Sequence, residues 1–186
     1  MPTVLTFAGV DTKKTFLDCC VVYRGLSTTA ITGLGHLEGC TVGVLADGYV
    51  HADRVVSGGA ITLDAPATIV HVGLAYESLI QPMRLDVDDT VGNTQGTVKN
   101  IRGVTLRLLD TLGLQVTDLN GKTYRKVIFR NTEDAMGSAP PLFTGDKYHE
   151  IDSDYDDDAT IVLKQDQPLP WTLLGLVIHY DVTGTQ

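Results

Sequence analysis

Short apolar runs separated by turn residues recur along the chain, and this spacing is typical of β-sheets. Asp47-Gly48 lies between two strand-like runs within residues 41–52. Because an Asp-Gly pair accepts the positive φ angles of a type I′ turn, this segment predicts a β-hairpin. Ser57-Gly58-Gly59, within residues 53–63, and Asn120-Gly121 predict two further hairpins by the same reasoning.

Four longer runs of β-branched and aliphatic residues predict strands outside these hairpins. They are Thr68–Tyr76, Ile101–Leu109, Ala159–Lys164 and Thr172–Asp181. We expect Asp64-Ala65-Pro66 to break the chain before the first of them, because proline has no amide hydrogen to donate. Apolar residues at helical spacing over three turns are missing from the sequence.

These patterns predict an all-β fold, an antiparallel barrel or sandwich of about ten or more short strands. Residues 86–98 and 131–158 lack strand periodicity, so we expect them to form long surface loops. Residues 1–30 are a candidate N-terminal arm. A length of 186 residues suits a single β-rich domain spanning residues 1–186.

The charge balance argues against nucleic acid as a partner. The formal net charge is −9, whereas a nucleic-acid-binding protein needs lysine and arginine to displace phosphate counterions. No apolar run approaches the roughly 20 residues that span a bilayer, and the N-terminus lacks the pattern of a secretory signal. We therefore expect a soluble protein with no membrane partner.

Residues with catalytic potential are scattered. The five histidines form no HxH or HExxH arrangement, no serine lies in a GxSxG motif, and the three cysteines have no zinc-type spacing. Adjacent Cys19 and Cys20, with Cys40, are expected to be reduced thiols. The sequence therefore predicts a protein that is not an enzyme and that has no required cofactor.

The most unusual local feature is an acidic stretch, DKYHEIDSDYDDD, at residues 146–158. Its carboxylates at alternate and adjacent positions resemble a set of oxygen ligands for Ca²⁺. The EF-hand pattern fails, since Asp157 occupies the glycine position and Leu163 the position of the terminal glutamate. Two hypotheses stay open, a bare solvated loop and a Ca²⁺ site. The candidate ligands are Asp152, Asp154, Asp156 and Asp158.

Several short segments together resemble one family, the C-terminal β-module of large tail-associated structural proteins of tailed bacteriophages and prophages. The segments are Gly33–Val42, Leu45–Gly48, Val56–Gly59, Val70–Tyr76, Ile101–Leu108, Pro141–Asp146 and Val162–Trp171. They occur in order from about residue 16 to residue 180. Members of that family are far longer, so the chain is either a small separately encoded version or an excised domain.

The resemblance implies a non-catalytic component of a phage tail, of the nozzle or tail-tube-associated type. It also implies a location in the virion after synthesis in the bacterial cytoplasm, with other tail proteins and further copies of the chain as partners. Contact with the host surface is a related expectation. The family supplies no catalytic residues to transfer.

A second hypothesis is a receptor- or glycan-binding module, assisted by Ca²⁺ at the acidic stretch. Exposed aromatic side chains would then provide the contact surface, because their rings offer a large apolar area with a polar tip. The candidate interface residues are Tyr148, Tyr155 and Trp171.

Overall fold

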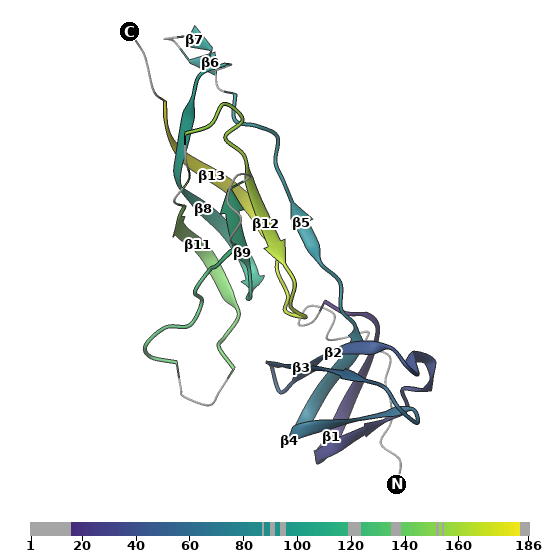
Figure 1. The fold of residues 1–186 in the computed structure, drawn as a ribbon. Coiled ribbons are helices and arrows are strands. Elements are labelled where there is room, and N and C mark those ends of the chain that lie inside the picture. The colour runs from purple at the N-terminus through teal and green to yellow at the C-terminus, as the bar shows by residue number, and fades with distance from the viewer. Residues whose placement is uncertain are drawn as a thin grey trace. The chain divides into compact units, whose positions relative to one another are not determined.

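The computed structural model describes residues 16–86, 88–89, 92–93, 96–118, 124–134, 139–151, 153 and 155–182. These residues form thirteen β-strands and one short 3-10 helix, which confirms the all-β prediction (Figure 1). Their contacts divide the chain into two compact units. The first unit comprises residues 1–77, 130–141 and 166–170, and the second comprises residues 78–129, 142–165 and 171–186. A single folding domain stays a prediction, since compact units of one chain can fold together.

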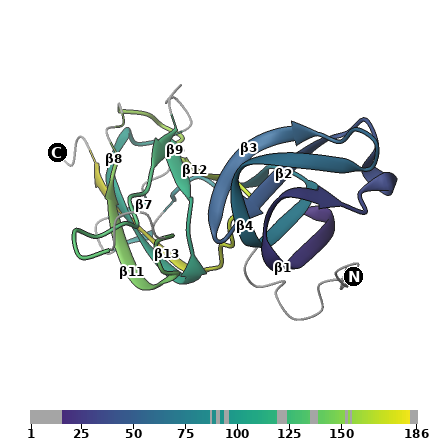
Figure 2. The ribbon, with the colours of Figure 1, turned by 90° about the horizontal axis from the view of Figure 1, so that it is seen from below.

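The first unit is built on one antiparallel sheet of four strands in the order β1-β4-β2-β3. The strands are β1 (Asp18–Thr32), β2 (Thr41–Ala46), β3 (Tyr49–Val55) and β4 (Ala60–Leu74), and the 3-10 helix η1 spans Gly35–Leu37. In Figure 2 the four strands curve around a common interior.

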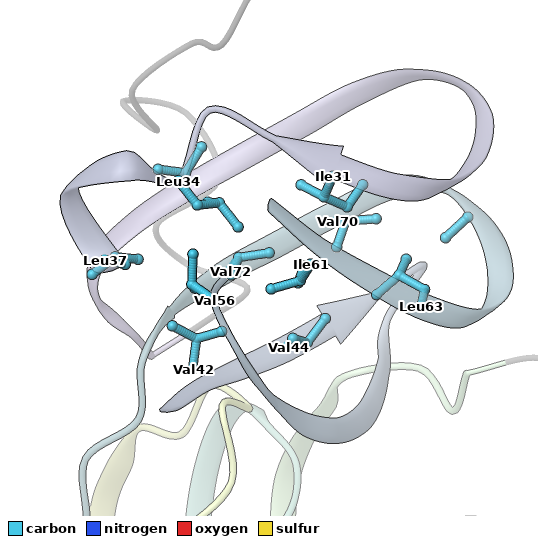
Figure 3. Close-up of a cluster of buried hydrophobic side chains, with 12 residues drawn as sticks. Ile31, Leu34, Leu37, Val42, Val44, Val56, Ile61, Leu63, Val70 and Val72 are labelled. Atoms are coloured by element: carbon cyan, nitrogen blue, oxygen red, sulfur yellow. The ribbon is translucent and has the colours of Figure 1, made fainter. Parts of the chain in front are cut away.

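Apolar side chains from β1, η1, β2 and β4 meet in one core (Figure 3). Because alternate residues of a strand point to opposite faces, the inward positions of β2 and β4 collect Val42, Val44, Val70 and Val72. Leu34, beside η1, is fully buried in the same cluster. The strands therefore enclose a core made mainly of aliphatic side chains.

The first predicted hairpin is confirmed. Asp47 and Gly48 adopt φ angles of 48° and 84° between β2 and β3, as a type I′ turn requires. The Asp47 carboxylate accepts hydrogen bonds from the Ile69 amide (2.8 Å) and the Thr68 hydroxyl (2.8 Å). Burial raises the pKa of Asp47, but these hydrogen bonds, with one from the Thr68 amide, lower it more, so the pKa is lowered overall. The turn residue thus also fixes β4.

The second turn is present, but the strands beside it pair differently from the prediction. Gly58 and Gly59 have φ angles of 61° and 68°, and the Glu38 carboxylate accepts hydrogen bonds from both amides (2.8 and 2.6 Å). Across this turn the described backbone forms only an isolated bridge between Ser57 and Ala60, while β4 pairs with β1 and β2. The predicted hairpin is therefore confirmed at its turn, while the described residues form no longer ladder between β3 and β4.

Two boundaries predicted in this unit are wrong. Pro66 does not interrupt β4. The β1 ladder shifts register between Thr28 and Ala30, opposite the stretch of β4 that contains Pro66, so a missing amide there costs no regular bond. Of the candidate arm, residues 18–30 belong to β1, and residues 1–15 lie outside the described residues. β1 and β4 each have 15 residues, so they are longer than the short strands expected.

The second unit is a sandwich of two antiparallel sheets. One has the order β11-β8-β13, with β8 (Lys99–Thr111), β11 (Phe143–Glu150) and β13 (Leu173–Val182). The other has the order β10-β9-β12-β5, with β5 (Ser78–Ile80), β9 (Gln115–Asp118), β10 (Arg125–Lys126) and β12 (Ile161–Gln165). A further two-stranded sheet joins β6 (Asp88–Asp89) to β7 (Gly92–Asn93), within the stretch expected to be a loop.

The core of this unit comes from the inward residues of both sheets. Val104 and Leu106 of β8, and Ile161 and Leu163 of β12, have no exposed surface. β9 and β10 pair antiparallel on either side of the third predicted turn, which confirms that hairpin. Asn120-Gly121 itself lies outside the described residues. The strands predicted around residues 101–109, 159–164 and 172–181 correspond to β8, β12 and β13.

The prediction that residues 131–158 form one long loop is wrong at its centre. Residues 143–150 form β11, whose side chains alternate between half-buried and exposed. The apolar alternation that identifies a strand is missing, because the partly buried positions include Lys147 and His149 and the exposed ones Asp146 and Glu150. A polar edge strand therefore escapes a search based on hydrophobic periodicity.

Candidate functional site

The outer face of the β11-β8-β13 sheet brings together three cross-strand rows of residues. Asp146, Arg107 and Gly175 form one row, and Tyr148, Thr105 and Val177 form the next. The third row is formed by Glu150, Gly103 and His179. Residues opposite one another in such rows lie close enough for their side chains to interact. We call these nine residues the outer face.

Tyr148 and His179 form the centre of the outer face. Their rings meet edge to face, with centroids 5.6 Å apart, and Nε2 of His179 lies 2.9 Å from the Thr105 hydroxyl. Tyr148 extends across Gly103, where an added Cβ would lie only 2.7 Å from Cζ of the tyrosine ring. A glycine is therefore needed under the ring. Tyr148 remains 54% exposed, so this positioned aromatic ring is open to a partner.

Ion pairs compensate the charges near these rings. Arg107 donates two hydrogen bonds to Asp146, from Nε (2.7 Å) and Nη2 (2.8 Å), and they lower the pKa of the Asp146 carboxyl. Arg102 pairs with Asp181. The outer face thus combines an aromatic ring, an exposed valine and an arginine side chain. Tyrosine and arginine are enriched where proteins contact their partners.

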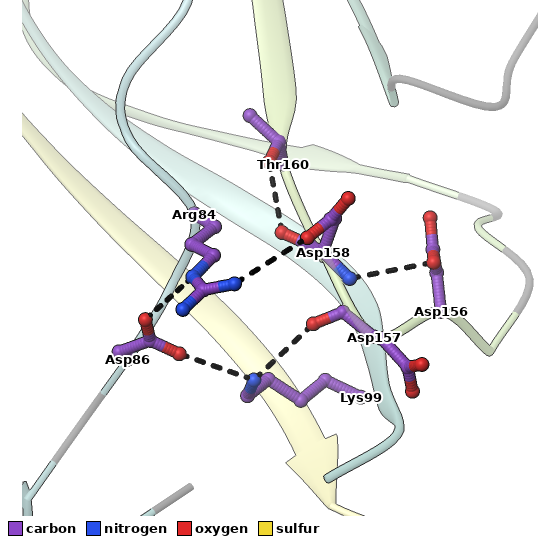
Figure 4. Close-up of polar contacts among 7 residues, drawn as sticks. All are labelled: Arg84, Asp86, Lys99, Asp156, Asp157, Asp158 and Thr160. Atoms are coloured by element: carbon purple, nitrogen blue, oxygen red, sulfur yellow. Dashed lines mark hydrogen bonds and ion pairs between the residues drawn. The ribbon is translucent and has the colours of Figure 1, made fainter. Parts of the chain in front are cut away.

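A second polar cluster anchors the acidic stretch (Figure 4). At its centre is Lys99, whose side chain has no exposed surface although it carries an ammonium group. Nζ of Lys99 lies 3.6 Å from Oδ1 of Asp86 and donates to the backbone oxygen of Asp157 (3.5 Å). The Lys99 and Asp156 backbones also exchange two hydrogen bonds of 2.9 Å. A buried charge needs such partners to be tolerated.

Arg84 extends the same cluster. Its Nε donates to Oδ2 of Asp86 (2.7 Å), and its Nη1 lies 3.9 Å from Oδ1 of Asp158. The amide of Asp158 donates to the Asp156 carboxylate (3.3 Å), and the Thr160 hydroxyl donates to the Asp158 carbonyl (2.8 Å). Two cations of the chain therefore lie beside the acidic stretch, and an added cation would compete with Arg84 for Asp158.

The candidate metal ligands are only partly within the described residues. Asp152 and Asp154 lie outside them, while Asp156 and Asp158 belong to the anchored segment above. Where the structure describes the chain, no three histidine, cysteine, aspartate or glutamate side chains gather in a way that could hold a metal ion. Binding of Ca²⁺ stays a prediction.

The three candidate interface residues occupy different places. Tyr148 lies on the outer face, Tyr155 is 55% exposed within the acidic stretch, and half-buried Trp171 precedes β13. The structure therefore does not gather them into one site. The sequence search missed Gly103, Thr105 and His179, because their grouping depends on β11, the strand that hydrophobic periodicity did not identify.

Comparisons with known proteins leave this site to be interpreted from its own residues. No model of a known protein family matches the chain, and no curated protein matches it significantly. Within the described residues, no helix has both the length and the apolar character needed to cross a membrane.

Proposed function

We propose that the protein is a non-catalytic structural component of a bacteriophage tail, of the nozzle or tail-tube-associated type, that contributes to assembly or to host contact. The ordered segments from about residue 16 to residue 180 that resemble tail-associated proteins support this proposal. The all-β architecture agrees with it, because such folds offer rigid sheets for contact with neighbouring subunits.

The observation that carries the proposal is the outer face of the β11-β8-β13 sheet. Tyr148 is held against Gly103 and His179 and is half exposed, and Val177 beside it is 56% exposed. A positioned aromatic ring loses little conformational freedom when it meets a partner, which favours binding. A partner protein of the virion is the occupant that the resemblance suggests.

One observation also supports the alternative, a receptor- or glycan-binding module. The exposed Tyr148 ring is accompanied by the Arg107–Asp146 pair, whose polar groups lie at the edge of the same face. Aromatic rings beside hydrogen-bonding side chains are suited to sugar surfaces, which are polar at their hydroxyls and apolar at their ring hydrogens. Host attachment would then be the function, with the acidic stretch as a candidate Ca²⁺ site.

Deleting the gene from the phage or prophage that encodes the chain separates the two functions. A tail component is expected to leave particles with missing or incomplete tails in electron micrographs. An attachment module is expected to leave complete particles that do not adsorb to the host. Complete particles that adsorb normally would contradict both proposals.

Complementing the deletion with point variants tests the outer face itself. Tyr148→Ser is expected to reduce the yield of infectious particles at least tenfold, while the purified variant unfolds at nearly the wild-type temperature. Tyr155→Ser removes an equally exposed tyrosine from another part of the unit and serves as the matched control. If Tyr155→Ser reduced infectivity and Tyr148→Ser did not, the contact surface would lie at the acidic stretch and not on the outer face.

A further inference from the structure

The free edge of β13 is a second exposed feature of the same sheet. In the described part of the chain β13 pairs only with β8, so its other edge carries no strand. Between two register shifts, residues 175–179 pair regularly with β8. Alternate amide and carbonyl groups of this segment therefore point outward from the sheet in the geometry that a further strand would need.

The other edge strands of the described sheets differ from β13 in charge or in length. Charged residues lie in β1, β3, β10 and β11, where they protect an edge from unwanted pairing. β5 carries no charge but has three residues. β13 has one charged residue, Asp181 near its end, and its run from Leu173 to Tyr180 contains no aspartate, glutamate, lysine or arginine. The uncharged run of similar length in β1, Gly25–Thr32, differs because its ladder with β4 is interrupted by register shifts.

Side chains on both faces of β13 are incompletely covered. Leu176 and Ile178, on the inner face, are only half-buried, and Val177, on the outer face, is mostly exposed. An edge strand leaves its apolar side chains open on the side where the next strand would lie. A neighbouring strand with similar side chains would cover them, whereas a charged strand would lose hydration there.

We propose that β13 pairs antiparallel with β13 of a second copy of this chain, about a two-fold axis at Val177. In this register Val177 faces Val177, Gly175 faces His179, and Leu176 faces Ile178 of the other copy. Each bulky side chain thus meets a small or apolar one, and no like charges oppose. The contact is isologous, so each copy uses the same segment.

The dimer joins two three-stranded sheets into one of six strands. The outer faces of both copies then belong to one surface, which carries two Tyr148–His179 pairs. Two linked sites bind a repetitive partner more tightly than either alone. The inference does not depend on the tail proposal, because a two-site surface serves an assembly component and an attachment module equally.

Sedimentation velocity of the full chain tests the pairing. The wild-type protein is expected to sediment as a dimer, and Val177→Lys as a monomer, because the substitution places two lysines opposite each other. Tyr148→Lys is the matched control, since Tyr148 is equally exposed on the opposite edge strand, and it should remain a dimer. Circular dichroism establishes that each variant is folded.

A charge exchange at the same position tests the register. Val177→Glu is also expected to be a monomer, whereas an equimolar mixture of Val177→Lys and Val177→Glu should again form dimers, because lysine then faces glutamate. A wild-type monomer at all concentrations would overturn the proposal. So would a Val177→Lys protein that remains dimeric, or a mixture of the two folded variants that stays monomeric.

Discussion

Carboxylates join strands in both units of the molecule, but some of those in the second unit also lie on a sheet with exposed aromatic and apolar side chains. In the first unit, Asp47 and Glu38 accept hydrogen bonds from backbone amides and thereby fix turns. Asp64 pairs with Arg54, which joins β4 to β3. These charged groups hold the strands of the unit itself, so their role is internal.

In the second unit, Asp146 and Asp181 pair with exposed arginines on one sheet. The pairs compensate charge around Tyr148 and Val177 without covering them. Under the proposed function, the second unit presents the contact surface and the first unit serves as a scaffold. Substitutions in the two units should accordingly separate stability from binding.

The largest effect should come from the core of the first unit. Leu34→Ala removes a fully buried side chain and is expected to lower the free energy of unfolding by about 2–5 kcal/mol. The same substitution at Leu174, which is 58% exposed in β13, should change it by less than about 0.5 kcal/mol. Urea denaturation measures both values. Equal losses in the two variants would contradict the division between scaffold and surface.

A smaller effect is expected at the turn held by Asp47. Asp47→Ala removes the acceptor for Thr68 and Ile69 and places alanine at positive φ, so we expect a loss of about 1–3 kcal/mol. Asp47→Asn tolerates the same backbone angle and should lose less.

The pH dependence of the Asp47 contribution has a definite sign. Since folding lowers the pKa of this carboxyl, its contribution is fully present above the unfolded value of about 3.9 and disappears as the pH falls through the folded pKa. The two variants should therefore approach the wild-type protein in stability at very low pH. A gap between the wild-type protein and Asp47→Asn that does not narrow there would show that the charge of Asp47 is not the responsible group.

The smallest effect is expected in the second unit, at His149. Burial lowers the pKa of this histidine, and the charge of Arg125 lowers it further. Its buried Nε2 has no hydrogen-bond partner among the described residues. Stability from the neutral imidazole is thus present above about pH 6.5 and is lost as the pH falls through the lowered pKa.

His149→Leu should remove that part of the acid sensitivity. The chain has one tryptophan, Trp171, and it belongs to the second unit, so its fluorescence during urea unfolding reports this unit. Between pH 7 and 5 the urea concentration at which half of the wild-type protein is unfolded is expected to fall. The corresponding urea concentration for His149→Leu should stay nearly constant. Parallel pH dependence of the two proteins would show that His149 is not the responsible group.

The sequence predicted those turns and strands whose conformation depends on residues adjacent in the chain. Asp47-Gly48 forms the predicted turn because the angles required by the turn are a property of those two residues. The strand pattern of β8 and β13 was visible for a similar reason, since their inward positions are apolar and alternate along the chain.

Pairing between distant segments was not predictable in the same way. β1 joins β4 across about 40 residues, and no local pattern identifies that partner. Lysine is ordinarily a surface residue, yet Lys99 is buried, with Asp86 and the backbone oxygen of Asp157 as partners of its ammonium group. The outer face was missed for both reasons, since it needs an unrecognised polar strand and its correct register with β8.

Hydrogen exchange measured by mass spectrometry, on the free protein and on the protein in assembled particles, tests the central claim most directly. Peptides that cover residues 143–150 should gain protection in the particle, while peptides from residues 60–74 should exchange as in the free protein. New protection confined to residues 18–74, with unchanged exchange in β11, would contradict the assignment of the contact surface to the second unit.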